Sequence, residues 1–138
     1  MIKCRYDKCN ICEECDYYKQ YIKRRNTCRI AFKIIGNKSN IKSILNSMKN
    51  KFGMYDISVT YKSSEDDCAA YGYCKCQYTL HYNLENKYYW FEDDVAKYNL
   101  HVVMLSKNID GFCEDYECDN GKVVRSCGYY LIGDNFKL

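Results

Sequence analysis

A run of closely spaced cysteines near the start of the chain constrains its fold more than any other feature. Four cysteines fall within the twelve residues of segment 4–15, CRYDKCNICEEC, and the last three of them follow the spacing C-x2-C-x2-C. A cysteine placed three residues after another can turn back so that both sulfurs face one metal ion. Thiolates are the soft ligands that zinc and iron–sulfur clusters prefer. The segment therefore predicts a metal-binding loop.

Zinc is the metal that we expect in this loop. A closed structural zinc site takes four ligands, and the candidates are Cys4, Cys9, Cys12, Cys15 and Cys28. We favour Cys9, Cys12 and Cys15, with either Cys4 or Cys28 as the fourth ligand. An iron–sulfur cluster also uses closely spaced cysteines. Here no Cys-Pro pair follows and charged residues crowd the loop, so zinc is preferred over iron–sulfur.

The other cysteines have two interpretations. The chain holds eleven cysteines, and because this number is odd, a complete disulfide framework would leave one thiol free. Cys74 and Cys76 point the same way on a predicted strand, and Cys113 and Cys118 flank a predicted turn, so these four form a second candidate metal site. Buried thiols that line the core are the alternative that we favour.

The start of the sequence and its hydropathy indicate a cytoplasmic protein. No apolar stretch follows the basic residues of MIKCRYDKC, which is not the pattern of a secretory signal. No apolar run approaches the roughly 18 residues that span a membrane. We therefore expect no membrane association, and a compartment in which thiols stay reduced.

The two parts of the chain differ in charge. Residues 1–52 hold 13 Lys and Arg against 4 Asp and Glu, a net charge of +9, whereas residues 53–138 hold 8 against 14, a net charge of −6. This asymmetry predicts an anionic partner for the first part, although attraction between the two parts within the fold is the alternative. The candidate phosphate contacts are Lys19, Lys23, Arg24, Arg25 and Arg29.

Hydrophobic periodicity predicts an α+β domain over residues 28–138, preceded by a Cys-rich metal-binding appendage over 1–27. The expected helices cover 13–25, a segment capped by Ser39 or Asn40 that ends before Gly53, and one or two turns within 92–98. The second of these helices is expected to bury an apolar stripe formed by Ile41, Ile44, Leu45, Met48 and Phe52. The expected strands cover 28–35, 54–62, 72–83, 87–91, 100–106 and 122–132, the last as one strand or a bent pair. Segment 63–70 is expected to be a polar loop, and Asn120-Gly121 is a hairpin turn signal. The strand over 100–106 lacks alternation, which predicts burial on both faces.

Part of this order, β-α-β-β-α-β, is the ferredoxin-like pattern, and here a family resemblance appears. Residues 30–106 resemble the RNA recognition motif, with a first strand that ends near Gly-Asn and a helix that ends in Phe-Gly. Tyr71, Gly72 and Tyr73 match the aromatic–Gly–aromatic part of the third strand of that family. The resemblance implies an antiparallel sheet on which Tyr71 and Tyr73 stack nucleobases.

The match to this family has clear departures. Ala69 and Ala70 replace the basic residue and the glycine that precede the aromatics. Cys76 stands where a final aromatic is expected, and Ile34 stands where the first strand should offer a stacking aromatic. These departures put base stacking in doubt more than they do the topology.

The sequence carries no pattern that defines an enzyme. It has no P-loop, no G-x-G-x-x-G, no nucleophile elbow and no H-E-x-x-H. His81 and His101 are its two histidines, and both are expected to be surface or core residues rather than ligands. A metal-dependent enzyme is therefore the least favoured class.

Two binding functions remain. The first hypothesis is a non-enzymatic, zinc-stapled module that binds nucleic acid or a nucleoprotein complex. The alternative is a protein-binding inhibitor or adaptor that acts on a host complex through its acidic segment 110–119. The absence of proline and the abundance of Tyr, Asn, Lys and Ile are typical of a very AT-rich genome, such as that of a low-GC bacterium or its phage.

Elemental analysis of the purified protein tests the metal prediction. We expect one or two zinc ions per chain and no absorbance in the visible range, because zinc has a filled d shell. Iron with sulfide and a brown colour would show that the loop holds an iron–sulfur cluster instead of zinc. A protein free of metal would contradict the prediction of a metal-binding loop.

Overall fold

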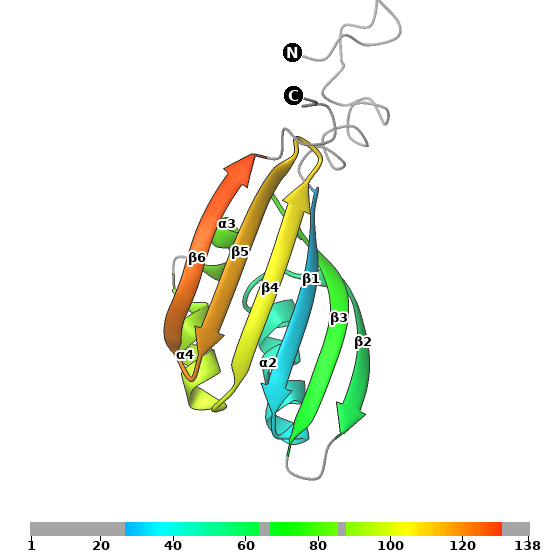
Figure 1. The fold of residues 1–138 in the computed structure, drawn as a ribbon, viewed down its shortest axis with the longest axis vertical. Coiled ribbons are helices and arrows are strands. Elements are labelled where there is room, and N and C mark those ends of the chain that lie inside the picture. Colours follow the sequence, from blue (N-terminus) through cyan, green and yellow to red (C-terminus); the bar gives the residue numbers. More distant parts are fainter. Residues whose placement is uncertain (1–26, 64–66, 86–87, 131–138) are drawn as a thin grey trace, which may run out of the picture.

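The computed structural model describes residues 27–63, 67–85 and 88–130, which form an α+β fold (Figure 1). Its elements, in chain order, are β1 (Thr27–Gly36), α2 (Lys38–Asn50), β2 (Tyr55–Ser63), β3 (Cys68–Gln77), α3 (Leu80–Leu84), α4 (Phe91–Lys97), β4 (His101–Asn108), β5 (Phe112–Asp119) and β6 (Lys122–Tyr130). None of the helices in these ranges has the length and apolar character that crossing a membrane requires.

The strands form one six-stranded sheet in the order β2-β3-β1-β4-β5-β6, and every neighbouring pair in it is antiparallel. The predicted α+β class and antiparallel sheet are thus confirmed. Helices α2, α3 and α4 lie behind the sheet in Figure 1, and none of the helices in the described ranges lies on its front face. The predicted Cys-rich loop and the predicted helix over 13–25 lie outside the described residues.

Strand β1 lies in the interior of the sheet, between β3 and β4, and its two faces differ in polarity. Cys28, Ile30, Phe32 and Ile34 are each at most 5% exposed and face the helices. The intervening side chains, which include Arg29 and Lys33, lie on the other face. This period-two alternation is the one that the sequence predicts for residues 28–35.

Helix α2 begins two or three residues earlier than the sequence predicts. Its N-cap is Asn37, whose side-chain oxygen accepts a hydrogen bond from the Ser39 amide at 2.9 Å, and not Ser39 or Asn40. Asn37 is available for this role because it directly follows Gly36, where β1 ends. The predicted apolar stripe is confirmed, since Ile41, Ile44 and Met48 are fully buried against the sheet.

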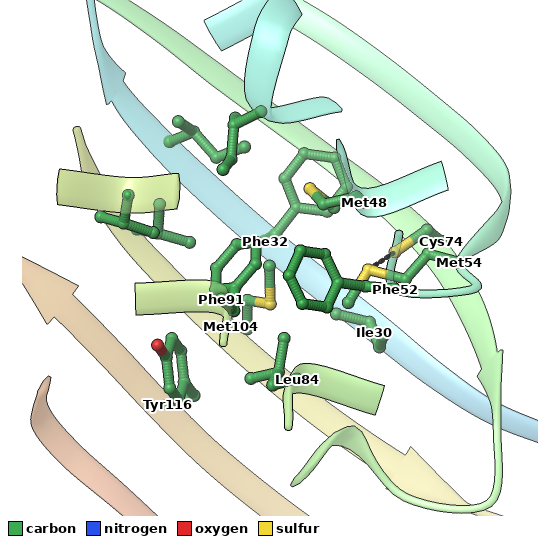
Figure 2. Packing of buried hydrophobic residues seen from close by; sticks show 14 of the residues in the cluster. Ile30, Phe32, Met48, Phe52, Met54, Cys74, Leu84, Phe91, Met104 and Tyr116 are labelled. Carbon is green, nitrogen blue, oxygen red and sulfur yellow. Dashed lines mark hydrogen bonds between the residues drawn. The ribbon is translucent and has the colours of Figure 1, made fainter. Parts of the chain in front are cut away.

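An aromatic cluster joins the helices to the sheet (Figure 2). The rings of Phe52 and Phe91 meet edge to face at a centroid distance of 5.3 Å, and Phe91 meets Tyr116 of β5 at 5.9 Å. Such edge-to-face pairs add stabilisation beyond the area that they bury. The cluster therefore couples the chain after α2, helix α4 and strand β5 into one core.

The predicted strand over 72–83 is wrong at both ends. Strand β3 already begins at Cys68, where the sequence predicts a polar loop, and it ends at Gln77. Tyr78 has a φ of 67°, which breaks the extended chain. Thr79 then caps α3 by accepting a hydrogen bond from the Tyr82 amide, and Leu80 packs into the core because the helical turn faces it inward.

Two further strand predictions are also wrong. Residues 88–91 form no ladder strand: Trp90 makes an isolated bridge to Glu85, and Phe91 starts α4. Strand β4 is buried on one face only, because Met104 is fully buried whereas Leu105 is 50% exposed. No helix in the described part of the chain covers the face of β4 on which Leu105 lies.

The turn between β5 and β6 agrees with the sequence. Asn120 and Gly121 have φ values of 50° and 90°, the positive φ at both central residues that a two-residue hairpin turn requires. Residues Lys122–Tyr130 form one strand, so the single-strand alternative holds over its described length, although its register with β5 shifts at Val124. It forms one edge of the sheet.

Replacing Gly72 by Ala tests the packing of β3 against β1. A Cβ atom at this position would lie 2.1 Å from the Ser58 carbonyl oxygen and 2.6 Å from Cζ of Phe32. We expect G72A to lower the free energy of unfolding by about 1–3 kcal/mol, the usual cost of overpacking, as measured by urea denaturation. The control T60A, at an exposed position of β2, should stay within about 0.5 kcal/mol of the unchanged protein. Equal stability of G72A and the parent would contradict this packing.

Candidate nucleic-acid interface

The front face of the sheet, which we call the open face, carries two neighbouring exposed aromatic rings. Tyr71 and Tyr73 occupy successive outward positions of β3 and are 38% and 70% exposed. Ala31 of β1 lies directly opposite Tyr73, and because its side chain is so small, the ring is left uncovered. Two residues along a strand are about 6.8 Å apart, so the rings form two adjacent places for flat ligands.

Cations flank the first of these rings. Lys33, opposite Tyr71 on β1, places its Nζ 5.5 Å from the centre of the ring, and Lys62 of β2 places its Nζ at 5.4 Å. Both distances lie within the range of a cation–π contact. The open face therefore offers positive charge and aromatic surface at the same point.

A row of three basic side chains crosses the same face. Arg29 on β1 lies opposite Lys75 on β3 and also opposite Lys107 on β4. Like charges that lie directly opposite each other across strands are destabilising. Asp56 offsets part of this repulsion, since its Oδ2 lies 3.5 Å from Lys75 Nζ. We call Lys75, Arg29 and Lys107 the basic row.

The open face is hollowed on both sides of the basic row. One hollow of about 590 Å³ is lined by the basic row together with Tyr73, Leu105 and Tyr129. A second hollow of about 710 Å³ shares the basic row and extends to Thr27 and Ile109. Both volumes lie in the range of small-ligand pockets.

The far side of the open face is acidic. Glu117 on β5 accepts from His101 Nε2 at 2.8 Å and lies 3.8 Å from the Arg125 guanidinium. Asp115, on the same face of β5, raises the pKa of the neighbouring Tyr129 by its negative charge. Within the acidic segment 110–119, Glu114 is 1% exposed and faces the helices, so it is not part of an exposed acidic surface.

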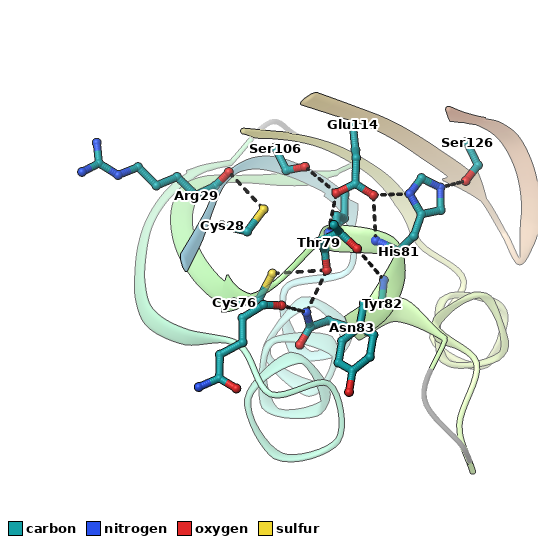
Figure 3. Close-up of polar contacts among 12 residues, drawn as sticks. Cys28, Arg29, Cys76, Thr79, His81, Tyr82, Asn83, Ser106, Glu114 and Ser126 are labelled. Atoms are coloured by element: carbon teal, nitrogen blue, oxygen red, sulfur yellow. Dashed lines mark hydrogen bonds and ion pairs between the residues drawn. The ribbon is translucent and has the colours of Figure 1, made fainter. Parts of the chain in front are cut away.

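Glu114 is the centre of a buried polar cluster (Figure 3). Its carboxylate accepts hydrogen bonds from the Leu80 amide at 2.6 Å, the His81 amide at 2.9 Å and the Ser106 hydroxyl at 3.3 Å. It also contacts Nδ1 of His81, while Nε2 of that ring meets the Ser126 hydroxyl. Since α3 is one short turn, these contacts hold its first residues against the sheet.

Ser126, His81 and Glu114 contact one another in the sequence serine–histidine–acid, as in the catalytic triad of a serine hydrolase. The position of the serine in the fold differs from that of a catalytic serine. Ser126 lies in regular ladder pairing with Tyr116 on the edge strand, and not on the tight strand-to-helix turn that exposes a nucleophile. Neither hollow of the open face is lined by His81 or Ser126. We therefore interpret the cluster as structural.

The structure does not bring the second candidate metal ligands together. Cys74 and Cys76 lie on the helix-covered face, Cys113 faces the open side, and Cys118 lies at the other end of β5 beside Val102. Nowhere in the described ranges do three or more His, Cys, Asp or Glu side chains gather so that they could share a metal ion.

The thiols in the core behave as small apolar groups. Burial raises the pKa of Cys74 to about 12, and the hydrogen bond with Cys28, together with burial, raises the pKa of Cys76. Both thiols are therefore neutral at physiological pH. This agrees with the interpretation of buried core thiols, except that Cys127 is exposed.

The structure places the predicted site residues in two groups. Tyr71, Tyr73 and Arg29 share the open face. Ile34, expected near the stacking site, is instead fully buried on the helix-covered face, and Ala31 is the residue opposite Tyr73. The remaining predicted residues lie outside the described residues: Cys4, Cys9, Cys12, Cys15, Lys19, Lys23, Arg24 and Arg25.

Sequence reasoning missed several cations of the open face. The alternation of residues 28–35 already puts Lys33 on the same side as Arg29, but it does not reveal the neighbouring strands. Lys107 could not be assigned to the open face from the sequence, because the apolar segment before it predicts a strand that is buried on both faces. Comparison of the chain with protein-family models, curated proteins and solved structures finds no match.

Replacing Glu114 tests the structural interpretation of the buried cluster. E114A removes the acceptor for two backbone amides of α3, and we expect it to lower the free energy of unfolding by about 3 kcal/mol, the scale of an unsatisfied buried network. The control D115A, at the neighbouring position on the open face, should change stability little. A thermal unfolding experiment compares the two, and similar midpoints for both variants would contradict the structural role.

Proposed function

We propose that the open face binds single-stranded nucleic acid. The observation that carries this proposal is the pair of adjacent exposed rings, Tyr71 and Tyr73, set among basic side chains on a rigid sheet. A ring stacks on any nucleobase, because every base has a flat π face. Lysine and arginine side chains beside the rings supply the attraction to phosphate that such binding needs.

The topology supports the comparison with the RNA recognition motif. Four of the strands follow the order β2-β3-β1-β4, with α2 between β1 and β2, and α3 and α4 between β3 and β4. We propose that this part is a ferredoxin-like unit and that the β5–β6 hairpin extends its sheet. The residue of β1 opposite Tyr73 is Ala31, so β1 supplies no aromatic ring at this position. Both proposed stacking rings therefore belong to β3.

We further propose that zinc organises the cysteine-rich segment before β1. Cys28 is 1% exposed and its side chain faces the core beside Cys76, which favours Cys4 over Cys28 as the fourth ligand with Cys9, Cys12 and Cys15. Thr27, the first described residue of the chain, lines the same hollow as the basic row. Free thiols throughout the described part of the chain support a reducing, cytoplasmic setting.

Protein binding is the second candidate function, and the edge strand β6 favours it. All nine residues of β6 are exposed, and among them Val124 and Tyr130 are 58% and 68% exposed. An exposed apolar edge strand can pair with a strand of another protein. Salt distinguishes the two functions, because binding through phosphates weakens steeply as ionic strength rises.

Replacing the two rings tests the proposed function. Base stacking on an aromatic side chain is worth about 1–3 kcal/mol per base, so Y71A and Y73A should each weaken binding of a single-stranded oligonucleotide by about 5- to 150-fold. Fluorescence anisotropy with labelled octauridylate and octadeoxyuridylate measures the affinity and shows which sugar is preferred. The control Y82A removes a 64% exposed tyrosine of α3 and should bind normally. Unchanged affinity of both Y71A and Y73A would contradict the proposal that the open face binds single-stranded nucleic acid.

A further inference from the structure

A gap between two large side chains lies within the hollow of about 590 Å³ on the open face. Ala31 of β1 lies directly opposite Tyr73 of β3 on one side and directly opposite Leu105 of β4 on the other. Neighbouring strands are about 4.8 Å apart, so the strands that carry Tyr73 and Leu105 are about 9.6 Å apart. The methyl group of Ala31 fills little of the space between these two side chains. We call this gap the Ala31 slot.

The walls of the Ala31 slot suit a flat ring. Tyr73 and Leu105 are 70% and 50% exposed, and both line the hollow. Side chains of a strand stand roughly perpendicular to the sheet, and stacked bases are about 3.4 Å apart, so a base has room to enter between the two walls. It would stack on Tyr73 and contact Leu105 with its other face, which would remove apolar surface from water.

Arg29 lies at one end of the Ala31 slot. It occupies the outward position of β1 that precedes Ala31, about 6.8 Å along the strand, and its side chain is exposed and lines the same hollow. The guanidinium is a planar fork of N–H donors and has no acceptor. It can therefore hold with two hydrogen bonds a base edge that offers two neighbouring acceptors.

The two carboxylates that line the hollow have other partners. Oδ2 of Asp56 lies 3.5 Å from Nζ of Lys75, and Glu114 accepts hydrogen bonds from two backbone amides of α3 on the helix-covered side. Neither contact involves the guanidinium of Arg29. The selectivity expected of Arg29 therefore comes from the shape of its fork and not from the net charge of the hollow.

Guanine has the base edge that fits this fork best. Its N7 and O6 are neighbouring acceptors that an arginine holds bidentately, whereas adenine carries an amino donor in place of O6 and cytosine presents an amino donor on the corresponding edge. We propose that the Ala31 slot binds one guanine base of a single-stranded nucleic acid and that Arg29 determines this specificity. This inference rests on the proposed function, which supplies the strand that bears the base.

The test uses labelled octauridylates in which one central uracil is replaced by guanine, adenine or cytosine. The full chain is titrated with each of these and with octauridylate itself, and fluorescence anisotropy gives the affinity. The guanine form should bind about 5- to 150-fold more tightly than octauridylate, the discrimination that a good bidentate contact to a base gives. The adenine form gains only stacking area and should fall between these two.

Two variants separate the fork of Arg29 from its charge and from the space beside it. R29K keeps the charge but loses the fork, so it should bind octauridylate as the parent does and lose the preference for guanine. A31V narrows the slot by two methyl groups and should also lose the preference. The control R125K makes the same change on β6, outside the lining of the hollow, and should keep it. Circular dichroism shows that each variant is folded.

The outcomes distinguish this inference from the proposed function. Equal affinity for all four octamers, with Y73A weaker than the parent, would overturn the guanine site and leave the stacking face in place. A stronger preference for adenine or cytosine, or a preference for guanine that survives in R29K, would overturn the role of Arg29. If none of the four octamers binds, both the guanine site and the proposed function fail.

Discussion

Burial of alternate side chains of strand β1 is the constraint on which the rest of the structure depends. Ile30, Phe32 and Ile34 face the helices and are almost fully buried, so the chain must supply helices on that side and strands on both edges of β1. Because the alternation has a period of two, the same strand must turn Arg29 and Lys33 to the other face. The polarity of the open face therefore follows from the packing of the core.

The elements that sequence patterns predicted well are those in which one local signal dominates. The apolar stripe of α2 and the Asn120–Gly121 turn are examples. Helix α3 could not be predicted, because its start depends on the left-handed conformation of Tyr78 and on contacts with Glu114, which is distant in sequence. The exposure of one face of β4 could not be predicted for a related reason. A continuous run of apolar residues does not show which face of the strand the helices will cover.

The candidate site was predictable only in part. Tyr71, Tyr73 and Arg29 could be named from the sequence, but the pairing of Arg29 with Lys75 and Lys107 is a property of strand order. That pairing brings three basic residues to neighbouring positions on one face of the sheet. We propose nucleic acid rather than a simple anion as the ligand, because the aromatic rings on the same face would add base stacking.

A titration of the isotopically labelled full chain with octauridylate, followed by amide NMR shifts, tests the central claim most directly. If the open face binds, the largest shifts should fall on β3, β1 and β4, around Tyr71, Tyr73 and Arg29, and α2 should be unaffected. Shifts confined to β6 or to the helices, with those three strands unchanged, would contradict the account and would favour a binding surface elsewhere on the molecule.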